Sequence, residues 1–488
     1  MSEAISSSLK RPNLLQQACL IDGAWVRADE GETLDVVDPA TAGLLARVPR
    51  MGRMETERAI AGAAEAMQAW SGRTARERAQ VLRRWSDLML ANQEDLAKLM
   101  TLEQGKPLAE SRSEIAYAAS FLEWFGEEAK RADGELLQPQ RSGQRIAVIK
   151  QPVGVCAAIT PWNFPAAMIT RKVGPALAAG CTIVVKPAEL TPLSAFALGV
   201  LALEAGVPPG VLQILTGDAA AIGRALCRSE TVRKLSFTGS TGVGQLLMQQ
   251  CAPTVKKLSL ELGGNAPLLV FDDADLETAV EGILASKFRN TGQTCVCANR
   301  IYVQDGIHDA LVERLTERVR ALAVGPGLEA GVAQGPLIDE RAVAKVQAHV
   351  DDALAGGAKL RTGGGPHPAG GNFYLPTVLS GVTHDMRVAR EETFGPLAPV
   401  FTFGTEEQAI AMANSTEFGL AAYLFTEDRR RIWRVSEQLE CGMVGVNTGL
   451  ISNEVAPFGG VKQSGLGREG SRHGLDEYLE LKYLCMQD

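Results

Sequence analysis

Residues 237–244 read F-T-G-S-T-G-V-G and lie between an apolar run at 235–237 and a helical stretch. Glycines at such a junction let the backbone approach a pyrophosphate, and the first turn of the helix offers free N–H groups at its positive dipole end. The spacing is G-x-x-G-x-G, whereas the usual dinucleotide fingerprint is G-x-G-x-x-G. The string alone is therefore compatible with either a nucleotide site or a simple tight turn.

Strand-like and helical stretches alternate around this string. Apolar runs of strand length occur at 153–159, 182–185, 213–215 and 235–237. Helical stretches separate them at 173–179, 192–205 and 219–228. This alternation predicts an α/β fold with a parallel, doubly wound sheet.

A second alternating series runs from 266 to about 446. It includes a strand-like run at 266–271 and helical stretches at 309–322, 342–356 and 406–414. Upstream, 54–69 and 77–102 have the apolar spacing of amphipathic helices, and 145–150 reads as a partly exposed strand of a hairpin. The glycine-rich stretch 362–372 indicates a surface loop.

Length and composition predict a globular protein of two or three domains. The chain has 488 residues and a formal net charge of −8, which gives no reason to expect nucleic acid or an anionic membrane as partner. The longest uncharged stretch, 153–170, is interrupted by prolines, so we expect no membrane span. The first 13 residues lack the apolar core of a secretory signal, and the nine scattered cysteines fit free thiols in a reducing compartment. We therefore expect a cytoplasmic protein.

A second candidate for cofactor binding is V-V-K-P-A-E at 184–189, at the carboxyl end of an apolar strand. Ligands bind at that edge of open α/β sheets. Lys186 can donate to ribose hydroxyls and Glu189 can accept from them; the alternative is a solvated ion pair that caps the next helix. Glu189 would also repel a 2′-phosphate, an effect that Lys186 partly offsets. We expect NAD or NADP, with a slight preference for NAD.

A candidate nucleophile, Cys295, ends the string F-R-N-T-G-Q-T-C at 288–295. A lone cysteine is more often a small buried hydrophobe than a nucleophile. Two other strings supply the partners that nucleophilic catalysis needs. E-L-G-G-N at 261–265 puts the Glu261 carboxylate beside a flexible Gly-Gly, and P-W-N-F-P at 161–165 puts the Asn163 amide in a turn fixed by prolines.

Together with F-T-G-S, K-P-A-E, E-E-T-F-G-P at 391–396 and P-F-G-G at 457–460, these strings closely resemble the aldehyde dehydrogenase superfamily. The resemblance runs from about Leu20 to Leu484, in order and with matching spacing. It implies the aldehyde dehydrogenase fold, with a doubly wound, Rossmann-like cofactor domain, an α/β catalytic domain and a small β oligomerisation element. The expected ranges are 1–133 and 152–263, then 264–465, and then 134–151 with 466–488. Homotetramers or homodimers are usual in that family, and the edge strand expected at 480–484 needs a partner.

The resemblance also implies a role for each site residue. Cys295 is the nucleophile, Glu261 the general base and Asn163 an oxyanion donor, and Lys172 lies near enough for its charge to help keep Cys295 a thiolate. A carbonyl carbon releases hydride only when tetrahedral, the resulting alkoxide needs donors, and the later thioester needs an activated water. The residues expected to contact the cofactor are Thr160, Trp162, Lys186, Glu189, Gly239, Ser240, Glu392 and Phe394.

The match tightens to the succinate-semialdehyde dehydrogenase branch through I-T-R-K at 169–172, the string 287–297 and G-L-I-S-N at 449–453. That resemblance implies that Arg171, Arg289 and Ser452 bind the distal carboxylate of a small semialdehyde substrate, with Phe458 in the same pocket. A guanidinium pairs with a carboxylate through two hydrogen bonds, although a structural ion pair is the alternative for each arginine. Glutarate semialdehyde is one methylene longer, a difference worth only about 1–3 kcal/mol, so both substrates stay open.

Cys297 follows Cys295 by two residues, as it does in that branch. One hypothesis is a reversible disulfide that blocks the nucleophile under oxidation, and the alternative is a passive core thiol. No metal site is expected, because the five histidines show no ligand spacing to these cysteines. The rival functions are a CoA-acylating relative and a crystallin-like structural protein. The retained Glu261 argues against the first, and the intact catalytic set argues against the second.

Overall fold

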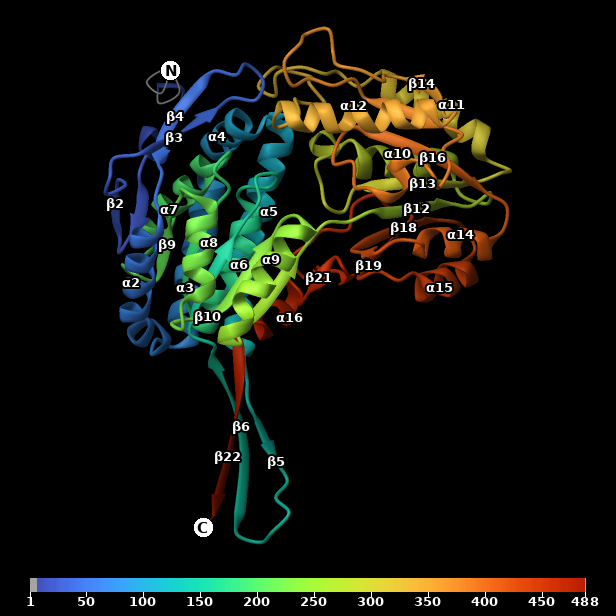
Figure 1. The fold of residues 1–488 in the computed structure, drawn as a ribbon. Coiled ribbons are helices and arrows are strands. Elements are labelled where there is room, and N and C mark those ends of the chain that lie inside the picture. Colours follow the sequence, from blue (N-terminus) through green and yellow to red (C-terminus); the bar gives the residue numbers. More distant parts are fainter. Residues whose placement is uncertain (1–6, 488) are drawn as a thin grey trace.

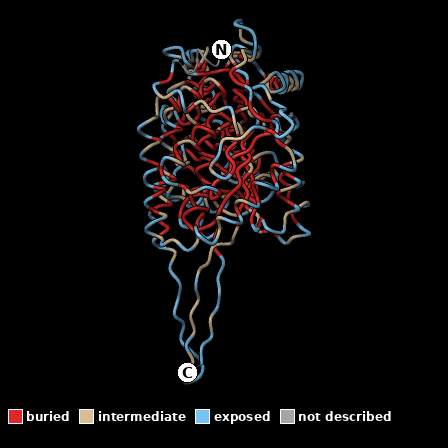
Figure 2. The backbone as a smooth tube through the Cα atoms, turned by 90° about the vertical axis from the view of Figure 1, so that its left-hand side faces the viewer, coloured by how far each residue is buried: buried red, intermediate tan, exposed pale blue. Residues whose placement is uncertain are grey.

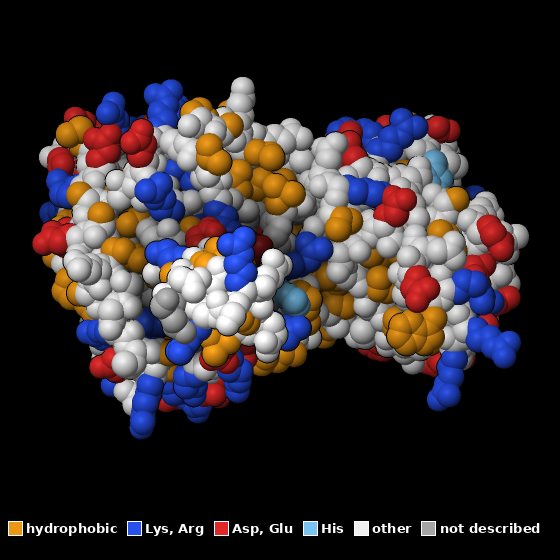
Figure 3. Space-filling model, turned by 90° about the horizontal axis from the view of Figure 1, so that it is seen from below, with side chains coloured by type: hydrophobic (Ala, Val, Ile, Leu, Met, Phe, Trp, Pro, Cys, Tyr) orange, Lys and Arg blue, Asp and Glu red, His pale blue; other side chains and the backbone are white. Residues whose placement is uncertain are grey.

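Two large α/β sheets carry most of the chain, and a slender three-stranded arm projects below them (Figure 1). The computed structural model describes residues 7–487. Seen from below, the sheets and their helices make two lobes joined by a narrower waist (Figure 3). Within the described residues, no helix is both long and apolar enough to cross a membrane.

The first sheet has eight strands in the order β2-β1-β9-β8-β7-β10-β11-β21. The parallel strands are β7 (Val155–Ile159), β8 (Thr182–Lys186), β9 (Leu212–Ile214), β10 (Val232–Thr238) and β11 (Lys257–Glu261). The antiparallel edges are β1 (Cys19–Ile21) with β2 (Ala24–Val26), and β21 (Gly465–Leu466). The strand order reverses between β7 and β10, and ligands bind at such a switch point in open α/β sheets. The predicted doubly wound sheet is confirmed.

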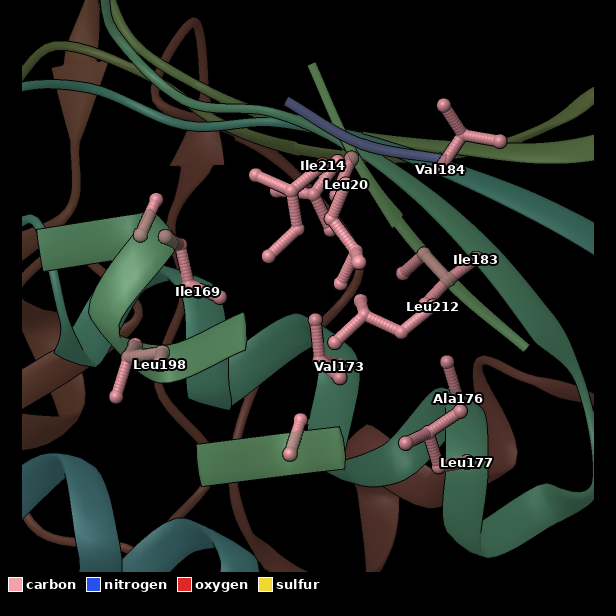
Figure 4. Packing of buried hydrophobic residues seen from close by; sticks show 14 of the residues in the cluster. Leu20, Ile169, Val173, Ala176, Leu177, Ile183, Val184, Leu198, Leu212 and Ile214 are labelled. Carbon is pink, nitrogen blue, oxygen red and sulfur yellow. The ribbon is translucent and has the colours of Figure 1, made fainter. Parts of the chain in front are cut away.

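Helices cover both faces of this sheet. One face carries α2 (Arg53–Ser71), α8 (Ala219–Arg228) and α9 (Thr241–Cys251). The other carries α3 (Ala75–Ala91), α4 (Gln93–Gln104), α5 (Leu108–Glu128), α6 (Ala167–Ala179) and α7 (Pro192–Ala205). Between the sheet and α6, the side chains of Ile183, Leu212 and Ile214 meet Val173, whereas Val184 points to the opposite face (Figure 4). Alternate residues of a strand point to opposite faces, so a strand covered on both sides is apolar throughout.

The second sheet has seven strands in the order β14-β15-β16-β13-β12-β18-β19. Its strands are β12 (Ala266–Val270), β13 (Ala298–Gln304), β14 (Lys359–Thr362), β15 (Thr377–Ser380), β16 (Leu397–Phe403), β18 (Ala421–Phe425) and β19 (Met443–Val446). Only the β14–β15 pair in this sheet, all of which lies in the described part of the chain, is antiparallel. Its helices are α10 (Leu276–Lys287), α11 (His308–Arg320), α12 (Glu340–Ala355), α13 (Arg387–Arg390), α14 (Glu406–Asn414) and α15 (Arg429–Gln438).

The arm is made of β5 (Glu135–Leu137), β6 (Gln144–Pro152) and β22 (Leu479–Gln487). All nine residues of β22 pair antiparallel with β6, and most of the arm is exposed (Figure 2). The chain reaches the arm indirectly: β21 first pairs with β11, and α16 (Ser471–Asp476) packs against α5 and α6. Of the described part of the segment 466–488, which the sequence assigns to this element, only β22 lies in the arm. Two small hairpins complete the fold: β3 (Thr33–Val37) with β4 (Leu44–Pro49), and β17 (Phe418–Gly419) with β20 (Val461–Lys462).

Two helical stretches differ from the sequence prediction. The stretch 77–102 is two helices, because Asn92 leaves helical geometry at φ −112° and ψ 19° and its side chain donates to Leu88 O at 2.7 Å. The helix expected at 173–179 begins earlier, at Ala167. Its first N–H groups are capped by a residue that is distant in the sequence: Glu114 Oε1 accepts from Ala166 N at 3.0 Å and from Ala167 N at 3.2 Å. This extension places Arg171 and Lys172 on a buried helix.

Candidate active site

Two cavities meet at Cys295. One has a volume of about 420 Å³ and the other of about 270 Å³, and the side chains of Cys295 and Met168 line both. Cys295 follows a short 3-10 turn, Arg289–Gly292, in which Asn290 and Thr291 have φ of 51° and 57°. Non-glycine residues in this left-handed region are uncommon and concentrate at functional sites. The turn brings Cys295 from the end of α10 to the boundary between the two cavities.

The side chain of Asn163 lies against this turn. Asn163 Nδ2 donates to Gln293 O at 3.0 Å, and Asn163 O accepts from Asn290 Nδ2 at 2.9 Å. Asn163 comes from the loop after β7, at the switch point of the first sheet. A buried amide donor is therefore held next to the nucleophile loop, as the sequence predicts for an oxyanion ligand.

Glu261 ends β11 and is 3% exposed. Its Oε2 lies 3.4 Å from Arg171 Nη2, and its Oε1 has no hydrogen-bond partner within residues 7–487. Burial raises the pKa of Glu261 to about 7, against the lowering effect of Arg171. A carboxyl group whose pKa is near neutral can exchange protons at physiological pH, which is the property of a general base.

Burial raises the pKa of the Cys295 thiol well above its usual value, and Glu261 adds to the rise. The cations that oppose this effect are Arg171 and Arg289. The sequence suggested Lys172 for this role, but the Lys172 ammonium pairs with the Glu469 carboxylate and donates to Thr238 Oγ1 at 2.7 Å. Glu469 pairs with Lys172 and also with Arg171, so its carboxylate offsets the charge of both cations.

The larger cavity contains every residue predicted for substrate binding. Its polar lining includes Arg171, Arg289 and Ser452, and Phe458 forms part of its apolar wall. The guanidinium of Arg171 lies 4.0 Å from the Phe458 ring centroid, and that of Arg289 lies 5.4 Å from the Phe164 ring centroid. Arg289 Nε is buried and has no hydrogen-bond partner among the described residues. A donor in this state is available to a ligand.

Sequence reasoning did not identify several residues around the larger cavity. Lys106, Glu110, Glu114 and Tyr117 line it from the N-terminal half of the chain, and Thr294 lines it beside the nucleophile. Lys106 Nζ donates to Asn163 O at 2.7 Å. Glu469, which pairs with Arg171 and Lys172, was also missed. A lysine or glutamate in a helix or loop is usually exposed to solvent, and only long-range packing reveals that it is buried.

The smaller cavity contains most of the residues predicted for cofactor binding. Its lining includes Trp162, Gly239, Ser240, Glu392 and Phe394, with Ala342 and Lys345 added from α12. The rings of Trp162 and Phe394 are edge to face, with centroids 5.6 Å apart. Burial raises the pKa of Glu392 to about 7, although Glu392 Oε1 accepts from Gly264 N at 3.1 Å.

Three further cofactor candidates lie on the first sheet. Lys186 ends β8, and its Nζ lies 2.7 Å from Glu189 Oε2. The pair is half-exposed through Glu189, so its side chains can still reach a ligand at the carboxyl edge of the sheet. Thr160 Oγ1 is buried and has no hydrogen-bond partner within residues 7–487. Thr160 follows β7 directly, beside the switch point.

Cys297 is buried beneath the nucleophile loop. Lys287 Nζ lies 3.2 Å from Cys297 Sγ, and Lys287 is itself fully buried. Burial raises the pKa of Cys297 despite this ammonium. All nine cysteines are free thiols, and no group of residues suited to a metal ion occurs in the described part of the chain.

Comparison with known proteins gives a consistent result over nearly the whole chain. A profile of the aldehyde dehydrogenase family matches residues 25–484. A glutarate-semialdehyde dehydrogenase of Pseudomonas aeruginosa is 62% identical over 478 residues, which cover 98% of this chain and 99% of that protein. A succinate-semialdehyde dehydrogenase (NADP(+)) of Escherichia coli is 60% identical with the same coverage. The crystal structure of a succinate-semialdehyde dehydrogenase from Burkholderia pseudomallei has a TM-score of 0.98 at 62% identity, covering 99% of this chain and 100% of that one.

Proposed function

Because this chain belongs to the aldehyde dehydrogenase family, we propose that it oxidises succinate semialdehyde to succinate with NAD(P), with glutarate semialdehyde as the nearest alternative. One observation carries the proposal. The cavity that contains Cys295 also contains two guanidinium groups, those of Arg171 and Arg289, and the hydroxyl-bearing Ser452. An aldehyde bound to Cys295 in this cavity would have a carboxylate-binding set at its other end. The volume of about 420 Å³ is ample for a four- or five-carbon acid.

The reaction begins at Cys295. Its thiol passes its proton to water, its sulfur forms a bond to the aldehyde carbon, and the carbonyl π bond opens, so that the carbon becomes tetrahedral and its oxygen becomes an oxyanion. The Asn163 amide and the Cys295 backbone N–H are the donors for that oxyanion. Asn163 Nδ2 now donates to Gln293 O at 3.0 Å, so a small rotation of the amide redirects it. Loss of one such donor typically costs about 10²–10³ in rate.

Oxidation of the tetrahedral adduct leaves a thioester on Cys295. The thioester is then hydrolysed, with Glu261 as the base. Glu261 takes a proton from water, the water oxygen bonds to the thioester carbon, and the carbon–sulfur bond breaks to release the acid and the thiolate. A pKa of about 7 leaves a large fraction of Glu261 ionised at neutral pH. A base that activates water favours water over CoA as the acceptor of the acyl group. Product analysis with and without CoA separates the two.

The lining of the smaller cavity suits the nicotinamide end of a dinucleotide. A Cβ at Gly263 would lie 3.3 Å from Glu392 Oε2, so glycine keeps this wall of the cavity open. Trp162 and Phe394 offer aromatic surfaces for a nicotinamide ring, and Glu392 can accept from ribose hydroxyls. When bound there, NAD(P) supplies the hydride acceptor. Thr160, Lys186, Glu189, Gly239 and Ser240 would hold the rest of the dinucleotide, and Glu189 favours NAD over NADP because it repels a 2′-phosphate.

In this scheme Lys172 orients another side chain and does not activate Cys295. Its ammonium pairs with Glu469 and bonds Thr238 at the end of β10. Glu469 in turn lies 2.9 Å from Arg171 Nε. Lys172 thus orients, through Glu469, the arginine that faces the substrate.

The arm supports assembly with further copies of this chain. Leu481, Tyr483 and Met486 of β22 are exposed, and Leu136 of β5 is 88% exposed. Apolar side chains on an uncovered strand mark an interface. We propose a homotetramer or homodimer, with 134–151 and 466–488 as the oligomerisation element beside the cofactor and catalytic domains. The nine free thiols fit a cytoplasmic location.

Cys297 extends the proposal to regulation. A peroxide can oxidise Cys295 to a sulfenic acid, and the Cys297 sulfur can displace water from it to form a disulfide. Lys287 beside Cys297 Sγ favours the thiolate that this displacement needs.

Steady-state kinetics test the function directly. Succinate semialdehyde and glutarate semialdehyde are each assayed with NAD and with NADP, and butanal serves as the uncharged control. The proposal expects kcat/KM to be highest for succinate semialdehyde with NAD and lowest for butanal. Equal values for butanal and both semialdehyde acids would contradict it.

A further inference from the structure

One guanidinium contacts two carboxylates in this site. Arg171 Nε lies 2.9 Å from Glu469 Oε2, and Arg171 Nη2 lies 3.4 Å from Glu261 Oε2. Arg171 is 1% exposed, and its other terminal nitrogen, Nη1, contacts Met168 Sδ at 3.7 Å. The Nε–Glu469 contact is an ion pair without hydrogen-bond geometry, since Nε and Glu469 Oε2 both lack a hydrogen-bond partner among the described residues. The Nη1–Nη2 edge holds only one long contact to oxygen and one to sulfur.

The two partners differ in their access to the cavities. Arg171 lines the larger cavity together with Cys295 and Arg289. Glu261 is absent from the described residues that line that cavity and from those that line the smaller one. The base that must activate water at Cys295 thus contacts Arg171 and forms no part of the described wall of either cavity at the thiol.

We propose that Arg171 is a latch, which holds Glu261 away from Cys295 until the carboxylate of the substrate takes its place. This inference rests on the proposed function, because it needs an aldehyde that carries a distal carboxylate. A carboxylate bound to the Nη1–Nη2 edge makes two charge-assisted hydrogen bonds, which is more favourable than one contact at 3.4 Å. Recognition of the substrate then releases the base, and carboxylate binding and thioester hydrolysis are coupled through one side chain.

The charges around Glu261 give the sign of the expected pH effect. Arg171 and Lys172 from α6 and Arg468 near the C-terminus lower the pKa of Glu261, whereas Glu469 raises it. A substrate carboxylate on Arg171 cancels the largest of these lowering effects. The released Glu261 is consequently a stronger base with a higher pKa. When the pH is lowered, hydrolysis of the succinyl-enzyme therefore begins to fall at a higher pH than hydrolysis of an uncharged acyl-enzyme.

Rapid-mixing kinetics on the wild-type enzyme test the latch. The first turnover forms the acyl-enzyme and a burst of reduced cofactor, and the following decay of the acyl-enzyme measures hydrolysis. We expect the succinyl-enzyme to hydrolyse at least about tenfold faster than the butanoyl-enzyme, a part of the roughly 10²–10⁴-fold that a positioned base contributes. We also expect the acid limb of the succinyl reaction to lie about one pH unit higher, as loss of a nearby opposite charge requires. Equal hydrolysis rates and equal acid limbs would overturn the latch.

Three variants separate the latch from a direct effect of the substrate carboxylate. In Arg171→Gln, Glu261 is free for every substrate, so the two acyl-enzymes should hydrolyse at the same rate, with butanoyl the one that gains. In the matched variant Arg289→Gln, the Arg171 contact is intact and the difference between the two acyl-enzymes should persist. In Glu261→Gln, succinyl hydrolysis should collapse. If it survives, the succinyl carboxylate attacks its own thioester and the latch is wrong.

The acylation step tells a failed latch from a failed function. If kcat/KM and burst rate favour succinate semialdehyde over butanal but hydrolysis does not, the proposed function stands and the latch falls. If acylation shows no such preference, the carboxylate-binding function itself is wrong. The wild-type comparison remains decisive even if Arg171→Gln fails to fold.

Discussion

Lys106 Nζ lies 2.5 Å from Glu114 Oε2, and each side chain is only 1% exposed. The Lys106 ammonium also bonds Asn163 O, and Glu114 caps the first N–H groups of α6. This buried ion pair therefore fixes both the loop that carries Asn163 and the helix that carries Arg171. Neither residue belongs to a motif recognised from sequence.

Lys106→Met should lower the free energy of unfolding by about 3–5 kcal/mol, because it leaves Glu114 buried without its partner. Urea denaturation followed by circular dichroism measures the loss. The control is Arg53→Met, which breaks the exposed pair with Glu57 and should cost about 0–1 kcal/mol. A loss at Lys106 as small as that of the control would show that the buried pair contributes little.

Arg289→Ala should raise KM for succinate semialdehyde about 10- to 100-fold, because a hydrogen bond to a charged group is worth roughly 1.5–3 kcal/mol. KM for butanal should change little, because butanal has no carboxylate. Initial rates over a range of each aldehyde measure both values. Parallel increases for the two aldehydes would mean that Arg289 supports the fold of the cavity instead.

Hydrolysis of the butanoyl-enzyme, in which Arg171 keeps its contact with Glu261, should fall as the pH drops through about 7, the pKa of Glu261. The sign follows from its role: only the ionised carboxylate accepts a proton, and burial raises its pKa from the ordinary carboxyl range. Glu261→Gln should retain the burst of reduced cofactor but lower steady-state turnover by roughly 10²–10⁴. Stopped-flow absorbance of the reduced cofactor separates the two phases. A variant that turns over at the wild-type rate would remove Glu261 from the mechanism.

Glu189→Ser should shift the ratio of kcat/KM values toward NADP by about tenfold, a change of about 1.4 kcal/mol in relative binding. The reason is that Lys186, now paired with Glu189 at 2.7 Å, becomes available to a 2′-phosphate. Glu437→Ser on α15 removes the same charge from an exposed helix and should leave the ratio unchanged. The idea fails if both variants shift the ratio equally.

Cys297→Ala should convert inactivation by peroxide from a form that dithiothreitol reverses into one that it reverses poorly. Without a second thiol, the sulfenic acid on Cys295 is open to further oxidation. Activity after peroxide, with and without dithiothreitol, measures the recovered fraction. Cys441→Ala, a half-buried thiol elsewhere, is the matched control. Unchanged recovery in Cys297→Ala would identify Cys297 as a passive core thiol.

The sequence predicted β7, β8, β9 and β10 of the first sheet, and helices between them, because their apolar periods are local. Residues 153–159 and 182–185 coincide closely with β7 and β8. The break at Asn92 was not predicted, because the apolar spacing continues from α3 into α4 without a glycine or proline. The early start of α6 depends on Glu114, 52 residues away, and no local pattern reports such a cap.

The same distinction divides the site residues. Cys295, Asn163, Arg171 and Arg289 stand in recognisable strings, and the structure brings all four to one place. Lys106 and Glu469 carry no such signal. Glu469 reaches Lys172 across 297 positions of sequence, so its burial is a property of the folded chain alone. The electrostatic role predicted for Lys172 stays a prediction, and its ion-pair partner Glu469 could not be anticipated from the sequence.

Cys295 lies in the wall between two cavities, and this position determines how ligands reach its sulfur. Ligands in the two cavities would reach the one sulfur atom through separate spaces, so neither would have to pass the other. Each cavity could therefore be filled or emptied while the other stays occupied.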